Sequence, residues 1–154
     1  MAELALIEEI REPATVRRFE LADLSTHGAW LLKRLALIFP DMPERAIAGY
    51  LTNLVFNNEH LFLCQPHAVA LAQMISSPGI RPVKMVQERF VFVEDKTDKE
   101  QLEDAADFYV NMKQWGKQAG AERIIVMENS DVPKSLVEAR LGRLFDTKIS
   151  HARI

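Results

Sequence analysis

Apolar residues recur at helical spacing near both ends of the chain and alternate, as in strands, through its middle. Residues 16–21 alternate and predict a first strand. Residues 23–38 carry an apolar stripe that is typical of a helix lying on a core. A second helix follows, with capping-box spacing between Asp41 and Glu44 at its start and Asn57-Asn58 at its end.

The middle of the chain changes to the period of strands. Segments 60–64, 68–76 and 83–93 predict three strands, and the turns between them contain proline. These connections are too short for helical crossovers, so we expect an antiparallel meander. Strict alternation in the third strand would place Met85, Gln87, Arg89 and Val91 on one face and Val86, Glu88, Phe90 and Phe92 on the other.

A long helix is predicted from Asp98, which has the side chain of an N-cap, to the glycines at 116 and 120. Residues 123–127 are mostly apolar and predict a buried strand. The preceding helix supplies the crossover that a parallel neighbour requires. A short helix then begins around Asp131 and Pro133, and 144–154 predicts a last strand. We therefore expect an α/β fold whose mixed sheet is mostly antiparallel, with a parallel pair at the fourth and fifth strands and helices on both faces.

Composition limits the class of protein. The chain has 154 residues, 48% of them hydrophobic, and a net charge of -3, as expected for one globular domain over 14–154 after an extension at 1–13. Neither a membrane-spanning run nor the clustered positive charge of a general nucleic-acid binder is present in the sequence. Cys64 and His67 have ligand-like spacing, but a core thiol is favoured and we expect no metal.

The order of elements from Val16 onward resembles that of the GCN5-related N-acetyltransferases. Residues 120–126 are similar to the family's passage from its long helix into its fifth strand, and 141–145 to its late glycine-aromatic signature. Residues 81–92 and the turn 128–130 resemble members encoded by tailed bacteriophages, including internal virion proteins. This resemblance implies a phage gene product, located in the cytoplasm of the host cell or incorporated in the virion.

The resemblance also implies where acetyl-CoA would bind. Phe90, Val91, Phe92 and Val93 would line the pantetheine arm, and the turn after them would hold the pyrophosphate. That turn has no glycine, and its only cations are Lys96 and Lys99 among seven acids between 94 and 107. Carboxylates repel a phosphate more strongly than one helix dipole attracts it. We therefore expect a fold that has lost the cofactor, with an active acetyl-CoA-dependent N-acetyltransferase as the alternative.

Catalytic residues are sparse under the same resemblance. Glu88 is the candidate base, because some family members use a glutamate of the fourth strand. The family's usual thiolate donor is a tyrosine four residues before the late glycine, and this chain has Glu138 there. The sequence alone therefore leaves the enzymatic activity open.

Positive charge gathers near the C-terminal end, while acids gather near the long helix. Such polarity favours association with a protein partner or with a second copy, although a solvated surface explains it as well. Neither nucleic acid nor a membrane is expected as the partner. The basic residues are Lys134, Arg140, Arg143, Lys148 and Arg153.

Overall fold

The computed structural model describes residues 14–127, 130–146 and 149–154, and these ranges contain one seven-stranded sheet. Its strand order is β1-β2-β3-β4-β5-β7-β6. The strands are β1 (Arg17–Arg18), β2 (His60–Gln65), β3 (Ala68–Ser77), β4 (Val83–Val93), β5 (Arg123–Val126), β6 (Phe145–Asp146) and β7 (Ser150–Arg153). The helices are α2 (Asp23–Ile38), α3 (Glu44–Val55), α4 (Lys99–Gln118) and α5 (Lys134–Leu141).

The sheet topology confirms the predicted fold class. All neighbouring strands are antiparallel except β4 and β5, which pair in parallel through Met85–Gln87 and Arg123–Ile125. The 20-residue helix α4 connects these two strands, as the crossover rule requires.

Three predicted boundaries are wrong. The first strand is limited to Arg17–Arg18, and the last strand divides into β6 and β7, which pair with each other in antiparallel orientation. The second helix begins after Pro43 without a side-chain cap, so Asp41 does not act as its N-cap. Pro43 suffices as a start, because a proline at a helix entrance removes an N–H that would lack a partner.

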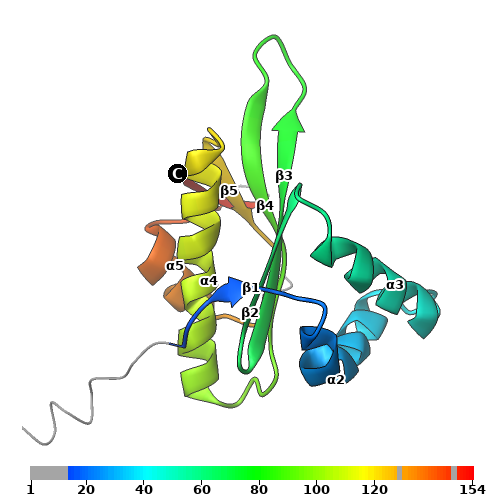
Figure 1. Ribbon diagram of the computed structural model, residues 1–154. Helices are drawn as coiled ribbons and strands as arrows, with labels where there is room; N and C mark the ends of the chain where they lie inside the picture. Colours follow the sequence, from blue (N-terminus) through cyan, green and yellow to red (C-terminus); the bar gives the residue numbers. More distant parts are fainter. Residues whose placement is uncertain (1–13, 128–129, 147–148) are drawn as a thin grey trace, which may run out of the picture.

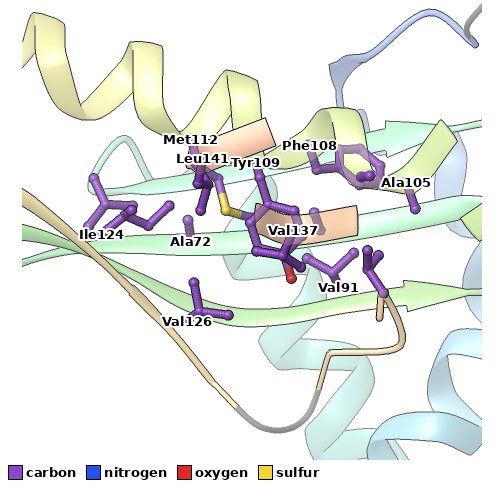
Figure 2. Packing of buried hydrophobic residues seen from close by; sticks show 14 of the residues in the cluster. Ala72, Val91, Ala105, Phe108, Tyr109, Met112, Ile124, Val126, Val137 and Leu141 are labelled. Carbon is purple, nitrogen blue, oxygen red and sulfur yellow. The ribbon is translucent and has the colours of Figure 1, made fainter. Parts of the chain in front are cut away.

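Two apolar cores lie on opposite faces of the sheet. Helices α4 and α5 cover one face, and α2 and α3 cover part of the other (Figure 1). In the first core, Phe108, Tyr109 and Met112 of α4 pack on the strands, as Figure 2 shows. The second core holds Cys64, a free and buried thiol whose pKa burial raises to about 11.

A β-bulge at Arg89 interrupts the alternation of β4. The register passes from Leu71 opposite Phe90 to Ala72 opposite Glu88, which leaves Arg89 as the extra residue. Phe90 therefore packs in the α2–α3 core, on the same face as Gln87 and opposite to Glu88. The single alternating pattern predicted for 83–93 is wrong beyond this point.

Gly116 lets α4 approach the sheet. A Cβ at this position would lie 2.6 Å from the Cγ2 atom of Val86 and 2.7 Å from the Cδ1 atom of Ile154. The absence of a side chain at Gly116 therefore allows this close contact between α4 and the sheet.

The described residues also bear on the membrane and metal expectations. Within them, no helix combines the length and apolar character needed to cross a bilayer. No three His, Cys, Asp or Glu side chains in the same ranges are grouped so as to hold a metal ion.

Candidate functional site

The candidate site lies where β5 diverges from β4, just beyond their short parallel pairing. A cavity of about 230 Å³ opens there, between the α2–α3 side of the molecule and the bulge of β4. Its walls combine apolar and aromatic side chains with the polar side chains of β4. The lining residues include Leu35, Ile38, Tyr50, Glu88, Phe90 and Met127.

Glu88 is the carboxylic acid that lines this cavity, and its side chain is fully buried. Neither carboxyl oxygen makes a hydrogen bond of ordinary geometry with any described residue. Burial raises the pKa of Glu88 to about 8, and the nearby Tyr109 hydroxyl and Met127 backbone only partly oppose this shift. Glu88 is therefore mostly protonated at neutral pH and is a weak base there.

The Tyr109 hydroxyl forms a hydrogen bond with Ser130, in the segment that follows β5. It lies 2.6 Å from the Ser130 Oγ atom, and Ser130 Oγ also accepts from the backbone N–H of Val132. Burial, reinforced by the neighbouring Glu88, raises the pKa of Tyr109 above its usual range. Tyr109 therefore stays neutral and holds the chain after β5 against α4.

An ion pair between Arg34 of α2 and Asp131 closes the free edge of β4. The Arg34 Nη2 atom lies 2.5 and 2.6 Å from the two carboxylate oxygens of Asp131, and its Nη1 atom donates to the Val93 carbonyl. Asp131 accepts from the Val93 N–H at 2.9 Å and donates its own N–H to the Val91 carbonyl at 3.0 Å. The Arg34 guanidinium also lies over the Phe92 ring, 4.6 Å from its centre.

We call these contacts the Arg34–Asp131 clasp. The Asp131 side chain is only 6% exposed, so the pair is shielded from solvent and its hydrogen bonds are strong. Ser130 and Asp131 line cavities of about 350 and 310 Å³. Asp131 thus forms part of the wall of both cavities, and the smaller one also reaches Phe92 of β4.

The turn between β4 and α4 uses its backbone donors internally. Asp98 accepts from the N–H groups of Glu100 and Gln101 and thereby caps α4, as predicted. Asp95 accepts from both the N–H and the hydroxyl of Thr97, and these bonds lower the pKa of Asp95. The Gln101 side chain accepts from the Asp95 N–H.

The predicted cofactor residues occupy different sides of β4. Phe90 and Phe92 stack on each other, with ring centres 4.6 Å apart, in the α2–α3 core. Val91 and Val93 are fully buried in the α4 core. Lys96 is exposed and lies 3.7 Å from an Asp131 oxygen, and Lys99 is exposed at the first position of α4.

These residues do not fit a coenzyme A molecule in the manner that the resemblance implies. The Val91 carbonyl and both polar backbone groups of Val93 already have partners in the clasp. The N–H groups of Glu100 and Gln101 already have the Asp98 carboxylate as their acceptor, and a phosphate would have to displace this negative charge to reach them.

The basic residues near the C-terminal end do not form one free surface. Arg140 donates to Asp107 at 2.8 Å and to Glu103 at 3.0 Å, so it joins α5 to α4. Lys148 lies outside the described residues. Lys134, Arg143 and Arg153 are exposed.

Three solved structures resemble this chain in fold. An acetyltransferase from Vibrio fischeri has a TM-score of 0.55 and 14% identity, over 77% of this chain and 98% of that chain. The aminoglycoside 6'-N-acetyltransferase AAC(6')-IG from Acinetobacter haemolyticus has a TM-score of 0.56 and 16% identity, over 87% and 93%. AAC(6')-Iy, solved in complex with CoA, has a TM-score of 0.51 and 15% identity, over 90% and 96%.

These likenesses show that the chain has the GCN5-related N-acetyltransferase fold. No protein-family profile matches the sequence, and no curated protein is similar to it in sequence. At 14–16% identity, the structural neighbours bear on the fold and not on the activity of this chain.

Replacement of Glu88 by glutamine tests the burial of its carboxyl group. Unfolded Glu88 ionises near pH 4.5, whereas the folded group has a pKa of about 8, so the unfolded state binds fewer protons between these values. The free energy of unfolding of the wild type should therefore fall relative to Glu88→Gln as pH rises from 5 to 8, by up to about 4 kcal/mol. Urea unfolding at four pH values measures this difference, and parallel profiles for the two proteins would show that Glu88 is not buried as a neutral acid.

Replacement of Arg34 by methionine tests the clasp. Because Asp131 would keep a buried charge without its guanidinium partner, we expect a loss of about 3 kcal/mol and a fall in Tm of roughly 6–12 °C. Lys96→Met is the matched control, since its exposed contact with the same carboxylate contributes less than about 1 kcal/mol. Equal effects of the two substitutions on thermal unfolding would contradict the clasp.

Proposed function

We propose that this protein uses the acetyltransferase fold as a binding scaffold, does not hold acetyl-CoA, and acts through association with protein. The observation that carries the proposal is the Arg34–Asp131 clasp. It occupies the backbone groups of β4 that the cofactor's pantetheine arm would use in the family that the chain resembles. A ligand would have to break these hydrogen bonds. The shielded charges of Arg34 and Asp131 would then lose partners that the ligand does not replace.

The turn before α4 supports the same proposal. A phosphate-binding turn offers free N–H groups to an anion. Here the side chains of Asp95 and Asp98 accept from Thr97, Glu100 and Gln101. Two separate parts of the expected cofactor path are thus occupied by the chain's own acids.

The setting we propose is a tailed bacteriophage, with the protein as a component associated with the virion. The similarity of residues 81–92 to phage-encoded members of the family supports this setting. We expect mass spectrometry of purified particles to detect the chain at a reproducible copy number per particle. Its absence from particles, despite expression in the infected cell, would contradict the virion setting and leave the binding scaffold untouched.

The second candidate function is that of an acetyl-CoA-dependent N-acetyltransferase, and the position of Glu88 supports it. A buried carboxyl on the wall of a cavity is a reasonable proton acceptor for an amine once it ionises. With a pKa of about 8, any activity that depends on Glu88 should rise as pH increases through 8. In this candidate, Lys96 and Lys99 would be the cations nearest to the pyrophosphate.

Thermal unfolding with and without acetyl-CoA separates the two candidates. The scaffold predicts a Tm change below about 1 °C at millimolar acetyl-CoA. A bound ligand at about a hundred times its Kd would stabilise the protein by about 2.7 kcal/mol, or roughly 5–10 °C.

The double variant Lys96→Met/Lys99→Met serves as the control for this experiment. A shift of 5 °C or more in the wild type that disappears in the double variant would establish the second candidate and overturn the scaffold. A shift that persists in the double variant would also overturn the scaffold, and would place the ligand away from these lysines.

A further inference from the structure

Half of one sheet face has no helix over it in the described structure. The core on the α2–α3 side contains residues of β2, β3 and β4 but none of β5, β6 or β7. Figure 1 shows α2 and α3 beside one end of the sheet only. We call the uncovered area the open face. Its residues, placed by strand register and alternation, are Met85, Arg123, Ile125, His151, Arg153 and Phe145.

The open face is both apolar and basic. Met85, Ile125 and His151 are half-buried, and the Phe145 side chain is exposed and stacks on the His151 ring. Arg123 and Arg153 are register partners on neighbouring strands, so their side chains emerge side by side. Arg143 and Arg153 each place a guanidinium 5.9 Å from the centre of the Phe145 ring.

Among the side chains that the structure describes, none forms an ion pair with these three arginines. Like charges on adjacent strands repel each other, and an arrangement of this kind is stabilised by an anionic partner. An aromatic ring with guanidinium groups beside it is also typical of the centre of a protein interface. The occupant of the open face should therefore carry acids next to apolar side chains.

The chain itself contains a segment of this chemistry. Residues 1–13 carry four glutamates and one arginine, and apolar side chains recur among the acids. The glutamates are Glu3, Glu8, Glu9 and Glu12, and the apolar residues are Leu4, Leu6, Ile7 and Ile10. This segment is the most acidic and apolar complement to the open face that the sequence offers outside the described residues.

The segment is too short to place its acidic middle on the open face of its own copy. Ala14 is bonded to Asp104 of α4 and lies at the β2–β3 turn, which is level with Val93 on β4. Arg123 and Arg153 of the open face are level with Met85, about 23–26 Å further along β4, and lie two and three strand spacings, or about 10 and 14 Å, across the sheet. The six residues from Glu8 to Ala14 span at most about 21 Å, even when fully extended.

From this geometry we propose that residues 1–13 of one copy bind the open face of a second copy. The proposal names the protein partner of the proposed function, and it rests on that function only in treating the chain as a binding scaffold. Two copies that exchange these segments make the same contact twice, which closes the assembly as a dimer. The arginines meet the glutamates, and Ile125 and Phe145 meet the apolar residues between them.

Nucleic acid fits the open face less well than an acidic protein segment does. The chain has a net charge of -3, and the acids around α4 would repel an extended polyanion. A direct contact between two open faces would oppose arginine to arginine. The exchanged segment avoids both costs because it brings few charges, of the right sign, to a small surface.

Sedimentation velocity of the full-length protein tests the proposal through charge reversal. We expect a dimer whose Kd weakens at least tenfold between 50 and 500 mM salt, as screening of the ion pairs requires. Arg123→Glu/Arg153→Glu and Glu8→Lys/Glu9→Lys should each sediment as monomers. Lys113→Glu/Lys117→Glu on α4 is the matched control, which changes the net charge as the arginine variant does but leaves the open face intact. Thermal unfolding confirms that each variant is folded.

A mixture of the two reversed variants gives the decisive result. In the mixture, the positive segment of the glutamate variant would meet the negative open face of the arginine variant. The negative segment of the arginine variant would meet the positive open face of the glutamate variant. The mixture should therefore recover the dimer that neither variant forms alone. A monomeric wild type, a dimer unaffected by either reversal, or no recovery in the mixture would each overturn the proposal. Retention of a labelled single-stranded RNA by the wild type but not by the arginine variant would make nucleic acid the occupant and would also overturn it. Binding of acetyl-CoA would overturn the scaffold and leave the dimer test unaffected.

Discussion

The ion pair between Arg34 and Asp131 joins helix α2 to the segment that follows β5, and the arrangement around the end of β4 depends on it. Arg34 belongs to α2, which packs on one face of the sheet. Asp131 follows β5, beyond the point where the pairing of β5 with β4 ends. Their charges satisfy each other and, at the same time, the backbone groups at the end of β4. Without the pair, the free edge of β4 would need another partner, because backbone groups at that depth require hydrogen bonds.

The divergence of β4 and β5 makes this constraint necessary. Their parallel pairing covers only three residues, and the bulge at Arg89 then turns Phe90 toward the α2–α3 side, opposite to Glu88. A cavity opens at the bulge, and a neutral Glu88 forms part of its wall. Beside this division, the clasp and the acids of the β4–α4 turn hydrogen-bond to backbone groups of β4 and α4.

Local pattern was sufficient for most of the fold. The meander, the N-cap at Asp98 and the parallel pair followed from turn residues, capping chemistry and the crossover rule. The bulge did not, because residues 83–93 alternate without a visible break. The packing role of Gly116 was not predicted either, since its close contact with Val86 depends on tertiary packing.

The site was predictable only in part. Glu88 lines the cavity, whereas Phe90 and Phe92 pack in the α2–α3 core and Val91 and Val93 in the α4 core. Arg34 and Asp131 are 97 positions apart, and neither carries a local signal of its partner, so the clasp emerged only from the structure. Arg140 was predicted as part of a basic surface, but two acids of α4 neutralise it.

Amide chemical shifts during a titration with coenzyme A measure the occupation of the β4 edge most directly. The signals of Val93, Glu100, Gln101 and Asp131 report on both parts of the cofactor path. If the clasp and the capping acids hold these groups, the four signals stay in place up to millimolar ligand. Saturable shifts of Val93 and Asp131 together with Glu100 and Gln101 would contradict the account, because they would show the cofactor displacing the protein's own side chains.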